Sequence, residues 1–284
     1  MRLLALLVTL CAPALAVAGV KQDLEKQVRR ELTPRLGQAM PDDSRIFVNG
    51  WRTSKSSAIA YVTGILGDAP GKPVTSKVQK LTVTVDEGRG LAWFHAQAKF
   101  SHMANLVRLH GIAKKGAAGW QLVATSYTWS LDDKFLADDA QVVPDQAIAL
   151  AGDAELAKLG TTWFESASLA KSAAAKPIAN GTADREYATG AAATKLAAKW
   201  DKLEMQALAV DGWSYGDYGL IRAKVALPIP KQKTAVVVFL TAIVVKEPGG
   251  WRWVSLNWAG LTTTSNADYV PDRRAPVNDA GGGT

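Results

Sequence analysis

Cysteine is almost missing from this chain of 284 residues, which contains one. Cys11 lies within the first 18 residues, a stretch with the features of a secretory signal peptide. Arg2 supplies the positive start, an apolar run follows, and small residues mark a cleavage site after Ala16 or Ala18. The mature chain therefore has no cysteine, which excludes disulfides, thiolate metal sites and cysteine nucleophiles. The expected location is periplasmic or secreted.

Long apolar segments and dense basic clusters are also lacking. The apolar run near the N-terminus is too short for a permanent membrane span. The net charge of +7 permits a weak preference for anionic partners. Lysine and arginine are scattered, however, without the aromatic-lined basic stripe of a nucleic-acid-binding protein, so no nucleic acid is expected as a partner. With 48% hydrophobic residues, two domains of about 120 residues each have enough apolar surface to fold without disulfides.

What the sequence does contain is two series of strands, each preceded by helical segments. Alternating and β-branched runs between short turns predict an antiparallel meander in each half. In the first half the predicted strands are residues 81–85, 90–101, 105–113 and 119–131. In the second half they are residues 204–211, 218–227, 233–246 and 250–262. Helices are predicted over residues 20–40, 145–176 and 191–202, and Gly152 and Gly160 are expected to break the second of these.

The two series are similar to each other. The strands at 119–131 and 250–262 both begin with Gly-Trp after a basic turn that contains glycine. The tryptophan of this pair lies 30 residues after Gly90 in the first half and 32 residues after Gly219 in the second. Aligning the halves keeps the apolar residues on the same face of each strand, whereas a slip of one residue would reverse every side chain. The sequence therefore predicts two copies of one domain.

Helices followed by a meander that ends Gly-Trp-Arg-Trp-Val-Ser-Leu-Asn-Trp, at residues 250–258, resemble the SnoaL-like branch of the nuclear transport factor 2-like superfamily. The stretch Gly-Ala-Ala-Ala-Thr-Lys-Leu-Ala-Ala-Lys-Trp, at 190–200, is similar to that family's third helix. The resemblance is clearest over 145–262 and weaker over 20–131. It implies an α+β fold with two tandem cone-like domains. In each domain, helices pack on a curved antiparallel meander of four or more strands and enclose a pocket.

The domain organisation follows from this resemblance and from the composition. We expect a signal peptide at 1–18, a divergent SnoaL-like domain at 20–140 and a second SnoaL-like domain at 145–262. A flexible tail at 263–284 completes the chain, because that stretch has no apolar period. The acidic segment at 132–144 is the expected boundary between the domains.

The face of each sheet that should line the hollow carries no titratable side chain. In the first half these residues are Ala92, Phe94, Ala96, Ala98, Phe100, Val107, Leu109, Gly111 and Ala113. In the second half they are Ile221, Ala223, Val225, Leu227, Val238, Leu240, Ala242 and Val244. An acid–base mechanism needs an ionisable group within reach of the substrate, so a non-catalytic binding module is favoured. A small apolar ligand is expected beside Ala223, Val225, Val238, Leu240 and Trp200, with no cofactor and no metal.

Two alternatives stay open. Members of the resembling family include cyclases, isomerases and hydrolases, and in the enzyme alternative a helix-borne carboxylate acts on the substrate. Asp184, Glu186 and Tyr187 are the reserve candidates for catalysis, should they reach a pocket. The other alternative is a purely structural envelope protein, for which a filled hollow would be the sign.

Two of the three histidines share the other face of the first sheet. His95 and His110 lie on it together with Gln97, Lys99 and Arg108. The functional hypothesis is a shallow ligand or metal site on the outside of the sheet. The simpler interpretation, which we favour, is a solvated sheet face, since two histidines without an acidic neighbour make poor zinc spacing.

The strand at 233–246 is apolar on both faces, which predicts that both are covered. Its outer face carries Phe239 and Ile243. We therefore expect the second sheet to pair through these two residues, either with the first sheet of the same chain or with another copy.

Overall fold

The structure is a computed structural model of the chain. It describes residues 19–33, 37, 40–56, 58–59, 75–101, 106–129, 152–181, 186–228 and 235–262. The predicted signal peptide, the expected domain boundary and the expected tail lie outside these residues. No helix in the described ranges has the length and apolar character needed to cross a membrane.

Two six-stranded sheets form the molecule. The first contains β1 (Arg45–Val48), β2 (Trp51–Thr53), β3 (Ser76–Asp86), β4 (Leu91–Phe100), β5 (Leu106–Gly116) and β6 (Gly119–Trp129). The second contains β7 (Ala173–Asn180), β8 (Tyr187–Thr189), β9 (Gln206–Tyr215), β10 (Tyr218–Pro228), β11 (Ala235–Glu247) and β12 (Gly250–Thr262). All eight predicted meander strands are present, so the α+β class with two sheet-based units is confirmed.

The two sheets have the same topology. Their strand orders are β2-β1-β6-β5-β4-β3 and β8-β7-β12-β11-β10-β9, which match position by position. In each sheet the last strand pairs in parallel with the first one, β6 with β1 and β12 with β7, while the other neighbours are antiparallel. Each sheet is therefore mixed and extends the predicted meander by two short strands.

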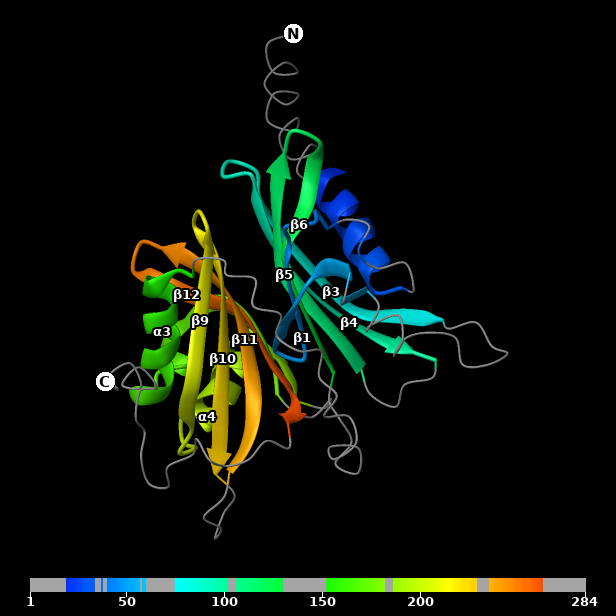
Figure 1. Cartoon of the computed structure of the whole chain (residues 1–284). Helices are drawn as coiled ribbons and strands as arrows, with labels where there is room; N and C mark the ends of the chain where they lie inside the picture. Colours follow the sequence, from blue (N-terminus) through cyan, green and yellow to red (C-terminus); the bar gives the residue numbers. More distant parts are fainter. Residues whose placement is uncertain are drawn as a thin grey trace, which may run out of the picture.

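Helices cover one face of each sheet. An N-terminal helix, described over residues 19–31, lies against the first sheet. The second sheet is covered by α3 (Ala154–Glu165) and α4 (Ala191–Trp200), with the short 3₁₀ helix η2 (Ala170–Ser172) between them. Figure 1 shows that the helices lie on the outer sides and that the uncovered faces of the sheets meet. The layers are thus helix, sheet, sheet, helix.

The predicted break at Gly160 is wrong, because α3 runs through this residue. A Cβ at this position would approach Val210 and Ile221 to 2.7 and 2.8 Å. The glycine therefore lets the helix lie close to β9 and β10, which is a packing role. The predicted helix at 145–176 is also too long, since β7 begins at Ala173.

Each unit has its own apolar core between helices and sheet. The predicted hollow faces of β4, β5, β10 and β11 do point to these cores. A third cluster lies between the sheets and joins Phe47, Leu91, Trp93, Ile112 and Ala124 of the first unit to Ile178, Trp213, Tyr218, Leu220, Ile243 and Val254 of the second. Phe239 and Ile243 are both fully buried. The outer face of the second sheet is thus covered by the first sheet of the same chain.

Candidate functional site

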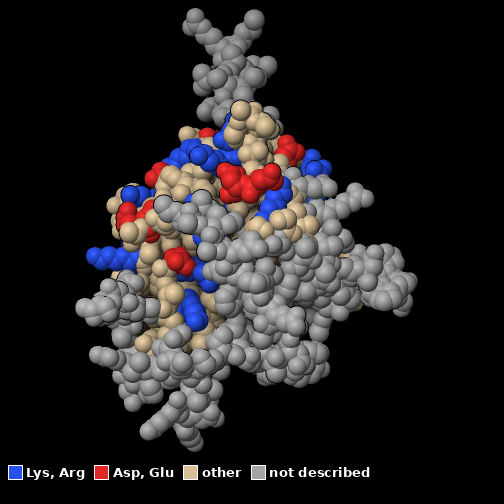
Figure 2. All heavy atoms as spheres, viewed as in Figure 1, with Lys and Arg blue, Asp and Glu red and all other residues tan. Residues whose placement is uncertain are grey.

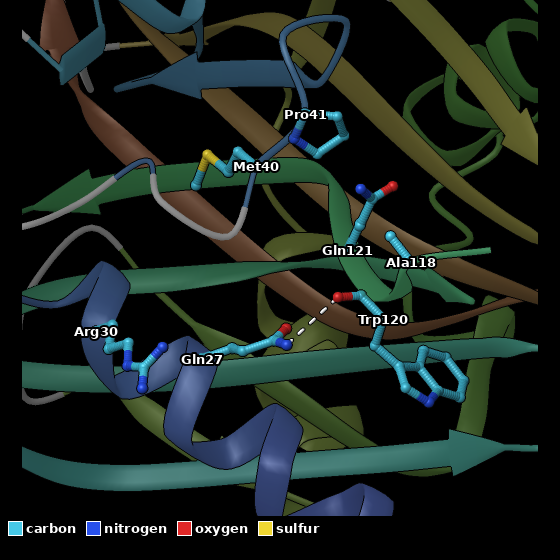
Figure 3. Close-up of a pocket in the computed structure, with 7 residues that line it drawn as sticks. All are labelled: Gln27, Arg30, Met40, Pro41, Ala118, Trp120 and Gln121. Atoms are coloured by element: carbon cyan, nitrogen blue, oxygen red, sulfur yellow. Dashed lines mark hydrogen bonds between the residues drawn. The ribbon is translucent and has the colours of Figure 1, made fainter. Parts of the chain in front are cut away.

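The first unit has a cleft of about 270 Å³ beside the tip of the β5–β6 hairpin (Figure 3). Three segments that are far apart in the sequence line it: the N-terminal helix, residues 40–41 and the hairpin. The described lining residues are Gln27, Arg30, Met40, Pro41, Ala118, Trp120 and Gln121. The Nε2 group of Gln27 donates a hydrogen bond of 3.3 Å to the carbonyl oxygen of Trp120. This bond joins the helix to the hairpin at the edge of the cleft.

Two lining side chains carry buried polar atoms without a hydrogen-bond partner among the residues that the structure describes. They are Oε1 of Gln27 and Nε1 of Trp120. Because the amide NH₂ of Gln27 must be the group that faces the carbonyl of Trp120, its Oε1 atom is a buried acceptor without a partner among the described residues. Arg30 lies one helical turn further on and is exposed. The residues that line the cleft therefore carry one exposed cation, one buried acceptor and one buried donor.

A carboxylate is buried in the core of the same unit. Glu31 is fully buried at the end of the N-terminal helix, and it accepts hydrogen bonds from the N–H group of Gly37 and, at 3.2 Å, from the hydroxyl of Tyr127. Burial first, and the charge of Glu31 second, hold the pKa of Tyr127 well above its usual value. Tyr127 belongs to the apolar cluster on the hollow side of the first sheet. The first hollow thus contains an ionisable pair, which corrects the prediction of a wholly hydrocarbon lining.

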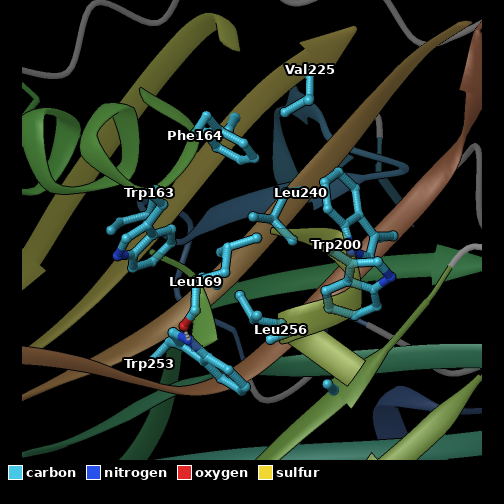
Figure 4. Close-up of a cluster of buried hydrophobic side chains, with 14 of the residues drawn as sticks. Trp163, Phe164, Leu169, Trp200, Val225, Leu240, Trp253 and Leu256 are labelled. Carbon is cyan, nitrogen blue, oxygen red and sulfur yellow. Dashed lines mark hydrogen bonds between the residues drawn. The ribbon is translucent and has the colours of Figure 1, made fainter. Parts of the chain in front are cut away.

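In the second unit the predicted ligand-binding residues come together, but they are covered by aromatic side chains (Figure 4). Ala223, Val225, Val238, Leu240 and Trp200 are buried in one cluster with Trp163, Phe164 and Trp258. The rings of Trp200 and Trp258 meet edge to face, with their centroids 5.6 Å apart. Phe164 packs on the same Trp258 at 6.5 Å. Aromatic rings from α3, α4 and β12 thus occupy the side of the sheet where an apolar ligand was predicted.

The reserve catalytic candidates do not gather in a hollow. Asp184 lies outside the described residues. Tyr187 lies between the sheets, with its ring 5.8 Å from the ring of His95 and 5.4 Å from Nζ of Lys80. Burial raises the pKa of Tyr187. Glu186, next to it, is partly buried and accepts a hydrogen bond from the N–H of Gly181 through its backbone oxygen.

The interpretation of the histidine face as solvated is wrong, and so is the hypothesis of a shallow outer site. His95, Gln97, Arg108 and His110 are buried, since the second sheet packs on them. His110 forms hydrogen bonds of 2.9 Å with Ser255 through Nδ1 and with Thr241 through Nε2.

Asn180 is the hub of the other half of this polar layer. It receives a hydrogen bond from Gln97 and donates to Nε2 of His95 at 2.7 Å and to Oδ1 of Asn257 at 2.6 Å. Arg108 donates to the carbonyl oxygen of Gly181. The polar residues of the first sheet therefore meet polar partners on the second.

Both histidines are held neutral by this environment. Burial, and after it the positive charge of Arg108, lowers the pKa of His95 to about 3. Burial, and after it the neighbouring His95, also lowers the pKa of His110 well below its usual value. No group of three metal-ligating side chains occurs in the described part of the chain. This buried polar layer provides a stabilising contact between the sheets.

The residues of the cleft and of the Glu31–Tyr127 pair were missed from the sequence. The hollow lining was predicted from β4 and β5 alone, which left out β6 and the helix. One signal was available: Glu31 directly precedes Leu32, the third member of the apolar series Leu24, Val28 and Leu32. A carboxylate on the edge of an apolar helix face is a candidate for burial in the core that the face covers.

The chain is similar to several solved structures, at low sequence identity. No protein-family model matches the chain, and no curated protein matches it in sequence. Among solved structures, an NTF2-like protein of unknown function from Pseudomonas putida KT2440 is 16% identical, covers 41% of this chain and 91% of its own, and gives a TM-score of 0.33. An NTF2-like protein with a cystatin-like fold from Novosphingobium aromaticivorans is 16% identical, covers 42% and 87%, and gives 0.32. An NTF2-like protein of unknown function in nutrient uptake from Rhodospirillum rubrum ATCC 11170 is 19% identical, covers 38% and 95%, and gives 0.30. These TM-scores are low.

Proposed function

We propose that the chain is an exported, non-catalytic binding module made of two tandem SnoaL-like units, which binds a small molecule in its first unit. The identical strand order of the two sheets supports the tandem arrangement. The signal-peptide pattern of residues 1–18 supports export.

One observation carries the assignment of binding to the first unit: the cleft of about 270 Å³ beside the β5–β6 hairpin. Small-molecule sites are concave and combine an apolar wall with a few polar groups, and this cleft has both. The second unit is the supporting part, because tryptophans cover its hollow side. A small apolar ligand beside Ala223 and Leu240 would first have to displace Trp200, which is 7% exposed.

A non-catalytic role is supported by the state of the buried carboxylate. Glu31 is fully buried and already accepts hydrogen bonds from Tyr127 and Gly37. A general acid or base must reach the proton it transfers, so this pair is better placed to hold the end of the helix than to act on a ligand. The second candidate function is an enzyme in which Glu31 is a helix-borne carboxylate, and it requires a hollow that opens to a substrate.

The test is native mass spectrometry of protein purified from its own host. We expect a small ligand to remain bound to the full chain and to be lost from the Ala118→Trp variant, in which an indole fills the cleft from the exposed hairpin turn. Ala117→Trp is the matched control, because Ala117 is the adjacent turn residue and is exposed outside the cleft.

Each outcome separates the candidate functions. A ligand that survives Ala118→Trp places binding elsewhere and overturns the proposal. A protein that never carries a ligand supports the purely structural alternative. Turnover of the bound molecule that disappears in Glu31→Gln, with binding retained, supports the enzyme.

A further inference from the structure

We infer that the cleft of the first unit binds a small carboxylate that carries a hydroxyl group next to the carboxyl group, that is, an α-hydroxy acid. This inference rests on the proposed function and specifies its ligand. Arg30 recognises the carboxylate, and Oε1 of Gln27 accepts a hydrogen bond from the hydroxyl group.

The charge of the cleft selects an anion. Arg30 is the charged side chain among the described lining residues. No carboxylate in the described part of the chain pairs with it: Glu31 faces the core and Tyr127, and Asp23 pairs with Lys26 at 3.2 Å. The forked guanidinium of arginine matches the two oxygens of a carboxylate, and such charged hydrogen bonds are about twice as strong as neutral ones.

Charged side chains of both signs are visible on the described part of the face that Figure 2 shows. Figure 2 shows positive and negative side chains interspersed on that face, with no large area of one sign. The polar groups around Arg30 must therefore supply any selectivity for one kind of anion.

Gln27 supplies the second contact. Its position three residues before Arg30 puts both side chains on one face of the helix, where Figure 3 shows them lining the cleft from the same side. Its amide orientation is fixed by the hydrogen bond to the carbonyl of Trp120, and its buried Oε1 atom has no partner within the described residues. A buried acceptor without a partner is destabilising, and a hydroxyl donor from the ligand would satisfy it. The acceptor therefore distinguishes a hydroxy acid from a plain acid.

The size of the cleft sets the upper limit of the ligand. A volume of about 270 Å³ lies just below the usual range for drug-sized ligands, which begins near 300 Å³. The remaining walls are Met40, Pro41 and the aliphatic part of Gln121, which suit a short carbon chain. A compact acid of a few carbon atoms fits this space.

The test is titration of the full chain, freed of any co-purified ligand, with sodium L-lactate, sodium acetate and propane-1,2-diol at low salt. Isothermal calorimetry measures affinity, and the indole N–H signal of Trp120 in NMR spectra, assigned with Trp120→Phe, reports the place of binding. We expect lactate to bind about tenfold more tightly than acetate, as the loss of one hydrogen bond predicts. Propane-1,2-diol, which lacks the charge, should show no saturable binding.

Two variants assign the roles. Arg30→Gln should weaken lactate binding about tenfold or more, since a charged hydrogen-bonding pair is lost. Arg29→Gln is the matched control, because Arg29 is exposed on the same helix and does not line the cleft, and it should leave the affinity unchanged. Gln27→Met should remove the preference for lactate over acetate while acetate binding persists.

The outcomes also separate this inference from the proposed function. Absence of lactate binding, or equal affinities in Arg30→Gln and the wild type, overturns the hydroxy acid. If the host protein carries a different ligand that Ala118→Trp excludes, the binding function stands and only its ligand class is wrong. If neither lactate nor a host ligand binds, both proposals fail.

Discussion

At the scale of single residues, Gly50 shows how closely the two units are fitted together. It lies in the turn between β1 and β2 with φ +80°, a conformation that favours glycine. A Cβ at this position would overlap the Cβ and Cγ atoms of Phe239, which belongs to the second sheet. The turn of one unit therefore rests directly on a side chain of the other. Gly50 has two reasons to be glycine, one from its own backbone and one from the contact.

We expect Gly50→Ala to lower the free energy of unfolding by roughly 2–4 kcal/mol, because backbone strain and overpacking add. Gly119→Ala is the control: φ is +103° there, but an added Cβ would meet nothing within 4 Å. Strain alone should cost about 1 kcal/mol at that position. Urea unfolding curves of both variants measure the difference. Equal losses would show that the contact with Phe239 contributes little.

The error about His95 and His110 also belongs to the residue scale. Alternation along β4 and β5 correctly put them on one face with Gln97 and Arg108. The alternation of side chains along a strand shows which of them share a face of the sheet, but it does not show what covers that face. Because the face is polar, it was predicted to be covered by water. It is covered instead by Asn180, Thr241 and Ser255 of the other sheet. A buried polar layer becomes predictable only when both of its halves are known.

At the scale of elements, the second half of the chain contains a segment in which strand pairing outweighs the local preference for helix. Residues 173–175 are all alanine, a good helix former, and they were predicted as helix. They form the start of β7 instead, since β12 offers a parallel partner. The register jumps from Ala173 opposite Trp253 to Ile178 opposite Ser255. Pro177 lies inside this irregular stretch, where a missing N–H does little harm.

Helix α3 begins directly after its N-terminal cap residue, Asp153. The start of this helix could be predicted from the sequence, because aspartate is a preferred cap residue. Asp153 accepts hydrogen bonds from the N–H groups of Glu155 and Leu156, at 2.9 and 3.2 Å. A hydrogen bond from Ser214 is the main cause that lowers the pKa of Asp153, and the two backbone bonds add to it. The cap joins the start of α3 to β9, where Ser214 lies.

We expect Asp153→Ala to lower the free energy of unfolding by about 1 kcal/mol, the usual cost of a lost N-terminal cap. Asp153→Asn keeps an oxygen that accepts from the same two N–H groups, so it should cost clearly less. Thermal unfolding followed by far-ultraviolet circular dichroism compares the two variants. If asparagine is as damaging as alanine, the negative charge rather than the cap stabilises the helix.

At the scale of the whole molecule, the two units and their apolar faces could be predicted, and the candidate site could not. Repetition of the strand series revealed the units, and the two-sided apolar pattern of β11 showed that its outer face is covered. The cleft is different, because Gln27, Met40 and Trp120 are brought together only by folding. None of them belongs to a motif with a chemical signature. Sites built from separate segments need the tertiary arrangement before their chemistry can be recognised.

The layer between the sheets makes the stability of the whole molecule depend on pH. His95 and His110 both face this layer, together with Arg108, Tyr187 and Lys80 from the strands around them. Folding lowers the pKa of both histidines, so the unfolded chain binds more protons than the folded chain once the pH falls below about 6.5. Their neutral forms therefore stabilise the fold fully above that pH, and this stabilisation is lost as the pH falls toward about 3, the folded value for His95.

We expect the free energy of unfolding to fall between pH 6.5 and pH 5 by about 1.4 kcal/mol per pH unit for His95, with His110 adding in the same direction. Guanidinium unfolding curves at pH 7.5, 6.5, 5.5 and 5.0 measure this slope, in a range where most carboxylates stay ionised. His95→Gln keeps an oxygen that can accept the hydrogen bond of Asn180 and cannot take up a proton, so it should flatten the curve. The double variant with His110→Gln should flatten it further. Equal stability of the wild type at pH 7.5 and pH 5.0 would mean that the two sheets admit a charged histidine between them, and the tightly closed polar layer described above would then be wrong.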